Sequence, residues 1–201
     1  HIYGLTKKQA SPTSPLGMKS NTTPRGTYLE ALNPLTVTLG IQNVSFVAQA
    51  VDWIPEVLYD IITAAYRHKG FSFVRIIQRC PEFLPKMFDP WLHDPNRTLL
   101  LTHERGLKIG AGTAKVYKNQ REHDPSNIHA AREVASLEDP IPVGILYRNP
   151  EVPCYEEVRN AGQLHTPEQV RKGLDSELDK YTVWPDAPQP GKDQTARPQA
   201  A

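Results

Sequence analysis

The sequence predicts an α/β fold, in which a parallel β-sheet with flanking helices is followed by a C-terminal extension. Residues 45–50 form a short apolar run of strand length, and residues 71–77 are rich in aromatic and β-branched side chains. Between them, residues 53–68 have the spacing of an amphipathic helix. Strand, helix and strand in this order form a right-handed βαβ unit. Ligands of such sheets bind at the carboxyl ends of the strands, so we expect a site where these strands end.

Each element of this first part has its own sequence signal. A short helix is expected over residues 33–40, because Leu35 and Leu39 lie four positions apart and Gly40 can end it. Asp52 is placed to cap the next helix. In that helix the apolar side chains recur on one face: Trp53, Ile54, Val57, Leu58, Ile61, Ile62, Ala65 and Tyr66. The strand that follows ends in a nearly unbroken apolar run, which is typical of a parallel strand covered on both faces.

The later part of the chain is more irregular. Residues 81–95 contain four prolines among aromatic side chains, which predicts an ordered loop packed on the main body. A strand, a helix and a second strand are expected at residues 99–102, 128–134 and 143–147. A last helix is expected from the capping residue Thr166 to about Tyr181. The tail over 185–201 is polar and rich in proline, so it is predicted to be disordered.

Charge and composition exclude several classes of function. The chain has 23 Lys and Arg against 22 Asp and Glu, so its formal charge of +1 gives no reason to expect a nucleic acid partner. No stretch approaches the ~18 consecutive apolar residues of a membrane-spanning helix, and the start lacks a signal-peptide pattern. Two cysteines, Cys80 and Cys154, are too few for a disulfide framework. The sequence therefore predicts a soluble, cytoplasmic protein without a membrane partner.

The loop after Tyr3 is the first candidate site. Gly4 permits close approach of a ligand to the backbone, and the Thr6 hydroxyl and successive amides could hydrogen-bond a phosphate. Lys7 adds a positive charge at the same place. Taken by itself, this pattern more often indicates a strand-to-loop turn with two solvent-exposed lysines. Tyr3 and the segment 78–80 both follow predicted strands, so we expect the two to meet at one edge of the sheet.

Cysteine and histidine residues give weaker signals. Cys80, at a strand end, would by itself be interpreted as a small buried thiol. Cys154 has no recognisable role and is expected to be structural or exposed. His123 and His129 are the two histidines that lie close together, but no third metal ligand follows at suitable spacing, so both are expected to be solvent-exposed.

Taken together, several short motifs resemble the β subunit of 2-oxoacid:ferredoxin oxidoreductases, most closely the 2-oxoglutarate type. They are Ile-Tyr-Gly-Leu-Thr-Lys-x-Gln-x-Ser-Pro-Thr, Phe-Val-Ala, His-Lys-Gly-Phe and Cys-Pro, at residues 2–13, 46–48, 68–71 and 80–81. The resemblance covers residues 1 to about 105, is weaker over 141–157 and is absent in the tail. It implies that residues 1–80 are the C-terminal part of a thiamine diphosphate-binding α/β domain and that residues 81–184 are the β-subunit extension.

The resemblance also implies cofactors and their residues. The Ile2 carbonyl would bind Mg²⁺, and Tyr3, Gly4, Leu5 and Thr6 would contact the diphosphate. Lys7 would lie near the reacting carbon and the substrate carboxylate. Cys80 would bind a 4Fe-4S cluster, whose other three cysteines would precede His1, as would two further Mg²⁺ ligands. The chain would therefore be a C-terminal fragment, inactive alone, that works with an α subunit, ferredoxin and coenzyme A.

Two alternatives stay open, and one residue departs from the family pattern. The substrate could instead be pyruvate or a branched-chain 2-oxoacid, although Lys7 in Gly-Leu-Thr-Lys argues modestly against pyruvate. The chain could also be a non-catalytic α/β scaffold subunit. The family usually has glycine at the position of Lys8, so a left-handed backbone there would strain the lysine.

Overall fold

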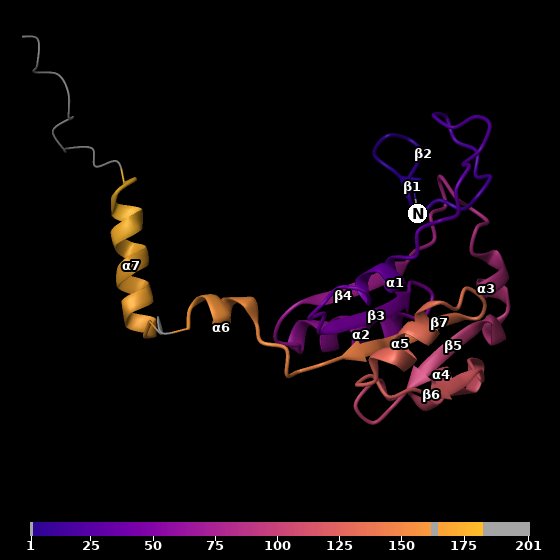
Figure 1. The fold of residues 1–201 in the computed structure, drawn as a ribbon. Coiled ribbons are helices and arrows are strands. Elements are labelled where there is room, and N and C mark those ends of the chain that lie inside the picture. Colours follow the sequence, from indigo (N-terminus) through magenta and orange to yellow (C-terminus); the bar gives the residue numbers. More distant parts are fainter. Residues whose placement is uncertain (1, 162–164, 183–201) are drawn as a thin grey trace, which may run out of the picture. The chain divides into compact units, whose positions relative to one another are not determined.

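The computed structural model describes residues 2–161 and 165–182 (Figure 1). The chain divides into two units, residues 1–158 and 159–201. The first unit holds a five-stranded sheet with the order β4-β3-β7-β5-β6. Its strands are β3 (Phe46–Val51), β4 (Ser72–Ile77), β5 (Thr98–Thr102), β6 (Gln120–Glu122) and β7 (Ile141–Arg148). The prediction of an α/β fold is therefore confirmed, with strands at three expected places and β7 slightly longer than expected.

The sheet is mixed rather than wholly parallel. β3 is parallel to β4, as the βαβ pattern predicts, and β5 is parallel to both β6 and β7. However, β7 runs antiparallel to β3 and joins the two parallel pairs into one sheet. The sheet therefore contains strands from both sides of residue 80 in the sequence: β3 and β4 come before it, and β5, β6 and β7 come after it. β7 also carries a bulge, since Val47 pairs with Tyr147 but Ala48 pairs with Ile145, which leaves Leu146 as the extra residue.

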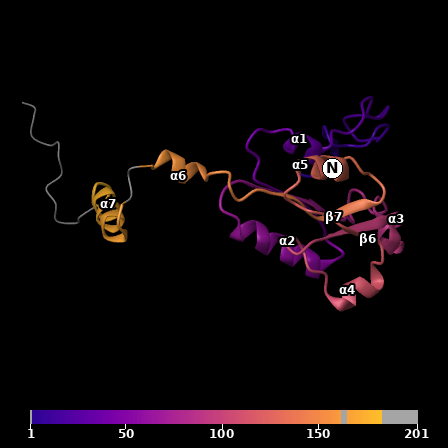
Figure 2. The ribbon, with the colours of Figure 1, turned by 60° about the horizontal axis from the view of Figure 1, so that its bottom comes forward.

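Helices cover both faces of the sheet. Helix α2 (Pro55–Arg67) lies on one face, whereas α1 (Pro34–Thr38) and α5 (Ile128–Ala135) lie on the other (Figure 2). The side chains of β3 alternate between these layers: Phe46 and Ala48 pack with the α2 side, and Val47 packs with α1 and α5. All six residues of β3 are buried, as expected for a central strand.

Two predictions about the βαβ unit are wrong in detail. Asp52 does not cap α2, because the helix begins with Pro55 and its N-cap position is Ile54, which makes no side-chain cap bond. The Asp52 carboxylate instead accepts hydrogen bonds from the backbone N–H and the Nε of Arg79 at 3.1 and 3.0 Å. β4 is not covered on both faces, because it is an edge strand in which only Ile77 is fully buried.

The proline-rich segment is ordered and packed on the body, as predicted. It contains α3 (Asp89–His93), and a 3-10 turn η1 (Pro95–Arg97) follows. Phe88 and Trp91 pack against the core cluster that includes Val51 and Ile77, the last residues of β3 and β4. The indole Nε1 of Trp91 donates to Asp139 at 3.1 Å, and the Arg97 guanidinium lies 4.9 Å above the indole and also pairs with Asp139. This cluster fixes the position of α3.

Three further helices complete the helical elements of the described residues. Helix α4 (Ala111–Val116) precedes β6, and α6 (Tyr155–Arg159) follows β7. In the second unit, α7 (Pro167–Asp179) begins with the expected Thr166 cap, which forms a capping box with Gln169. The predicted disordered tail lies outside the described residues. No helix in the described ranges is long and apolar enough to span a lipid bilayer.

Candidate functional site

The candidate phosphate loop is a tight hairpin. Strand β1 (Ile2–Tyr3) pairs antiparallel with β2 (Gln9–Ala10) in a two-stranded ladder of its own. The intervening turn is closed by a hydrogen bond from the N–H of Lys7 to the carbonyl of Gly4 at 3.0 Å. β1 is therefore not a strand of the five-stranded sheet, because the chain folds back at Gly4 and pairs locally.

The side chains of this loop face solvent. Leu5 is 99% exposed, and Gly4, Thr6 and Lys7 are also exposed. The Thr6 hydroxyl donates to the Tyr3 carbonyl at 3.3 Å, which leaves its oxygen able to accept a further hydrogen bond. The loop thus offers a glycine, a hydroxyl and a cation on one accessible turn, and this combination suits an anionic ligand.

Lys7 and Lys8 both have left-handed backbones, with φ of 57° and 73°. This is the strain foreseen at Lys8, where the family usually has glycine. A side chain in this conformation costs about 1–2 kcal/mol relative to glycine. The loop therefore holds an unfavourable backbone at two consecutive residues directly after the candidate phosphate contacts.

We expect Lys8→Gly to raise the free energy of unfolding by about 0.5–1 kcal/mol, because relief of the strain exceeds the entropy that glycine adds to the unfolded chain. Lys19→Gly is the matched control, since Lys19 is exposed and is not among the residues with positive φ. It should lower the free energy of unfolding. Urea denaturation of both variants measures the difference, and equal effects would contradict a strained Lys8.

Cys80 lies in a second tight turn, just after β4. Its backbone forms an antiparallel bridge with Leu84, whose N–H donates to the Cys80 carbonyl at 3.1 Å. The N–H of Phe83 donates to the Cys80 sulfur at 3.4 Å. The cysteine is a free thiol of intermediate exposure. A partly accessible sulfur that accepts a backbone N–H is suited to carry negative charge, as a metal-bound thiolate does.

The two turns lie next to each other, although 76 positions separate Gly4 from Cys80. A Cβ atom built on Gly4 would lie 3.9 Å from Cε2 of Phe83, which is ordinary van der Waals contact. The Asp52–Arg79 ion pair joins the ends of β3 and β4 beside them. The Gly4 loop and the turn that follows Cys80 therefore lie side by side, just past the carboxyl end of β4, and α/β sheets bind ligands at such strand ends.

The described residues do not by themselves form a metal centre. They contain no cluster of three or more His, Cys, Asp or Glu side chains that could hold a metal ion. The residues present nevertheless fit parts of the implied groups: the Cys80 thiol can bind iron, and the hairpin can contact a diphosphate. A complete 4Fe-4S cluster would need three further ligands.

The other cysteine and the two histidines occupy different surroundings. Cys154 donates from its sulfur to Glu156 Oε2 at 2.6 Å, and this bond lowers the pKa of Glu156. His129 is exposed, as predicted. The prediction for His123 is wrong: it is 4% exposed, and its Nε2 lies 2.7 Å from the carbonyl of the bulge residue Leu146. The pairing of β6 with β5 carries His123 inward.

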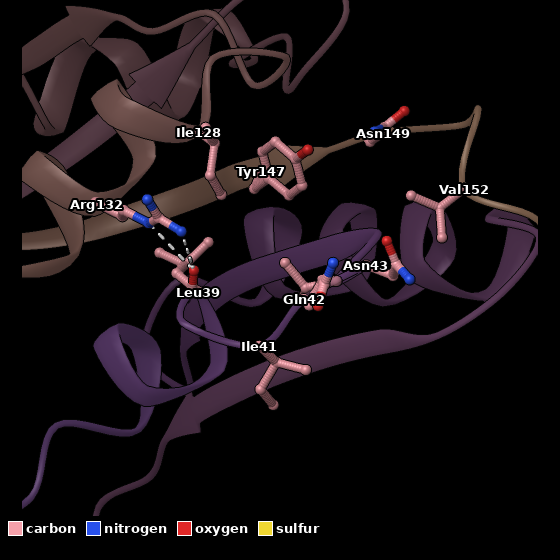
Figure 3. Close-up of a pocket in the computed structure, with 10 residues that line it drawn as sticks. Leu39, Ile41, Gln42, Asn43, Ile128, Arg132, Tyr147, Asn149 and Val152 are labelled. Atoms are coloured by element: carbon pink, nitrogen blue, oxygen red, sulfur yellow. Dashed lines mark hydrogen bonds between the residues drawn. The ribbon is translucent and has the colours of Figure 1, made fainter.

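Two hollows open on the α1/α5 side of the sheet. The smaller, of about 210 Å³, lies between the end of α1, α5 and the end of β7 (Figure 3). Its cation, Arg132, already donates to the Leu39 carbonyl at 3.0 and 3.2 Å. The larger, of about 620 Å³, is lined by Gln49 of β3 and Arg75 of β4, among others. Sequence reasoning missed both residues, yet each is a polar side chain inside an apolar strand, and this was the available signal.

Comparison with known proteins finds relatives among the ferredoxin-dependent 2-oxoacid oxidoreductases. The family model for the C-terminal region of the pyruvate ferredoxin oxidoreductase beta subunit matches residues 113–162. A 2-oxoacid:ferredoxin oxidoreductase subunit beta from a Sulfolobus species is 31% identical over 158 residues, which are 78% of this chain and 48% of the relative. The 2-oxoglutarate oxidoreductase subunit KorB of Mycobacterium tuberculosis is 36% identical over 112 residues, 55% of this chain and 30% of the relative.

A solved structure gives the same result for the fold. The 2-oxoglutarate:ferredoxin oxidoreductase from Magnetococcus marinus, with 2-oxoglutarate, coenzyme A and succinyl-CoA bound, superposes with a TM-score of 0.61 at 28% identity. The match covers 87% of this chain and 54% of that chain. The present chain thus spans about half the length, or less, of the relatives it matches. In sequence and in fold, it is a relative of the β subunits of 2-oxoacid:ferredoxin oxidoreductases.

Proposed function

We propose that this chain is part of the β subunit of a 2-oxoglutarate:ferredoxin oxidoreductase, which converts a 2-oxoacid and coenzyme A to acyl-CoA and carbon dioxide. The observation that carries the proposal is the contact between the Gly4–Lys7 loop and the Cys80 turn. A loop suited to an anion lies there beside the turn that holds a partly exposed thiol, near the carboxyl ends of β3 and β4. The relatives named for 2-oxoglutarate support the substrate.

Each residue has a defined part in this proposal. The Ile2 carbonyl would bind Mg²⁺, and the Tyr3–Thr6 backbone and the Thr6 hydroxyl would hold the diphosphate of thiamine. The Lys7 ammonium would orient the substrate carboxylate, since a cation fixes an anion at short range. Cys80 would bind a 4Fe-4S cluster, and the Phe83 N–H would offset negative charge on its sulfur.

The cofactors would supply the chemistry that side chains cannot: thiamine diphosphate would be the electron sink for decarboxylation, and the cluster would carry single electrons toward ferredoxin. The chain's own residues bind and orient these groups. We assign residues 1–80 to the thiamine diphosphate-binding part and 81–184 to the extension that completes the sheet. An α subunit and ferredoxin are the proposed partners, and the cytoplasm is the proposed location.

Calorimetry on the assembled enzyme tests the diphosphate assignment. Thr6→Ala should weaken thiamine diphosphate binding about 10-fold or more, because a hydrogen bond to a charged group contributes about 1.5–3 kcal/mol. Thr22→Ala is the control, since Thr22 carries the same hydroxyl and its only described partner is the Ser20 hydroxyl. Equal affinity in the Thr6 variant and the parent would remove Thr6 from the site.

A second candidate function is a pyruvate or branched-chain 2-oxoacid oxidoreductase. It is supported by the matching family model, which is named for pyruvate ferredoxin oxidoreductase. Reduction of ferredoxin by the assembled enzyme with a panel of 2-oxoacids separates the two. A higher kcat/KM for 2-oxoglutarate supports the first proposal, and a preference for pyruvate overturns it. If the assembly turns over no 2-oxoacid and binds no thiamine diphosphate, the chain is a non-catalytic scaffold.

A further inference from the structure

The larger hollow contains two polar groups that the fold leaves without partners. Gln49 is 2% exposed, and its Oε1 is buried with no hydrogen-bond partner among the described residues. Its Nε2 donates to the Pro142 carbonyl at 2.7 Å, and this bond fixes which end of the amide carries the oxygen. A buried acceptor without a partner lowers the stability of the fold by about 1–3 kcal/mol. A ligand that donates a hydrogen bond to it removes this cost, and the removal favours binding.

The second unpartnered group is a cation. Arg75 pairs with Gln49 in the parallel register of β4 and β3, so both side chains project from the same face of the sheet. Its Nε is also buried without a partner, and no ion pair of Arg75 is found in the described part of the chain. Burial lowers the pKa of Arg75, but a guanidinium stays protonated at neutral pH. An unpaired, half-buried charge of this kind favours an anion.

The surroundings form a pocket with a definite shape. The hollow of about 620 Å³ is within the range of about 300–1,000 Å³ that is usual for small-molecule sites. Phe88 and Trp91 supply an aromatic wall, and Trp91 is held in place by its bond to Asp139. Two carboxylates, Glu30 and Glu138, also line the hollow, but both are exposed, so solvent screens them more than the half-buried Arg75.

We propose that this hollow binds a small organic anion whose carboxylate or phosphate pairs with Arg75 and whose hydroxyl or N–H group donates to Gln49 Oε1. Adjacent strands lie about 4.8 Å apart, so the anionic group and the donor must be a few bonds apart in the ligand. A plain 2-oxoacid does not meet this requirement, because its keto oxygen accepts hydrogen bonds, as Gln49 Oε1 does. The site is therefore separate from the substrate site proposed at Lys7 and does not depend on it.

Calorimetry with matched probes tests this site on the purified protein in its native assembly. L-malate against succinate, and glycerol 3-phosphate against n-propyl phosphate, differ within each pair only by hydroxyl groups. We expect one pair to bind, with the hydroxylated member about 5- to 10-fold tighter, in line with one hydrogen bond. The pair that binds shows whether the anionic group of the ligand is a carboxylate or a phosphate. If none of the four binds at millimolar concentration, the proposal is overturned.

Variants then assign the binding to the two residues. Arg75→Gln should weaken the probe at least about 10-fold, and Gln49→Leu should abolish the preference for the hydroxylated member. Arg67→Gln is the control, because Arg67 is exposed on α2, on the other face of the sheet. Circular dichroism checks folding, and Arg75→Lys, which keeps the charge but not the planar fork, replaces Arg75→Gln if the latter does not fold. Unchanged affinity in a folded Arg75 variant refutes the assignment.

Discussion

Replacement of Gly144 by alanine is expected to destabilise the protein strongly, although it adds only one methyl group. A Cβ at this position would lie 2.7 Å from Cβ and 3.0 Å from the carbonyl oxygen of Leu101. Both residues belong to central strands, so neither can move without disturbing the sheet. Gly144 also has a φ of +149°, which side chains rarely adopt. Overpacking and backbone strain together predict a loss of about 3–5 kcal/mol.

Such a loss is a large fraction of the ~5–15 kcal/mol that stabilises a typical domain. It corresponds to a melting temperature roughly 6–20 °C lower for a chain of this size. Gly112→Ala is the opposite control, because nothing lies within 4 Å of the added methyl group in α4. That variant should gain up to about 1 kcal/mol from helix propensity. A Gly144 variant that melts with the parent protein would show that β7 and β5 are not packed as described.

In the assembled enzyme, Cys80→Ala is expected to eliminate the iron–sulfur signal in electron paramagnetic resonance. A 4Fe-4S cluster is held by four thiolates, and alanine offers no ligand in place of the sulfur. Thiamine diphosphate affinity should change little, because the variant keeps the backbone of the loop that faces Phe83. If the resonance signal is lost while thiamine diphosphate affinity is retained, the variant has lost a cluster ligand and has not unfolded.

Cys154→Ala is the matched control for the same measurement. Its sulfur donates to Glu156 and has no other described partner, so the resonance signal should persist. The titration of Glu156 should also change: the bond from Cys154 holds its pKa below the ordinary value, and the variant should raise it. A signal that survives in Cys80→Ala, or disappears in Cys154→Ala, would contradict the assignment of Cys80 as a ligand.

The local elements of this fold could be predicted because their signals are local. The spacing of apolar residues placed α2, short apolar runs placed β3 and β7, and aromatic and β-branched content placed β4. What could not be predicted is where the later strands join the sheet. β7 lies antiparallel between β3 and β5, and nothing in its own residues specifies that position. The burial of His123 follows from the same long-range pairing and was missed for the same reason.

The candidate site shows a similar division. The chemistry of Gly4, Thr6 and Lys7 is visible in one short motif, and the left-handed backbone at Lys8 could be foreseen as a departure from the family pattern. The contact between Gly4 and Phe83 depends on how two distant turns pack, so it needed the structure. Gln49 and Arg75 become neighbours only through the register of β3 and β4.

The place of β7 has a further consequence for how the protein is made. Strand β3 ends at Val51, but its partner β7 begins at Ile141, 90 residues later in the chain. At roughly 5–20 residues per second of synthesis, the open edge of β3 would wait for about 5–20 s before β7 emerges, and that of β5 for about 2–8 s. Such unpaired edges can associate with other chains. The nascent chain should therefore be most prone to aggregation in this interval, and most dependent on chaperones, until its last strand closes the sheet.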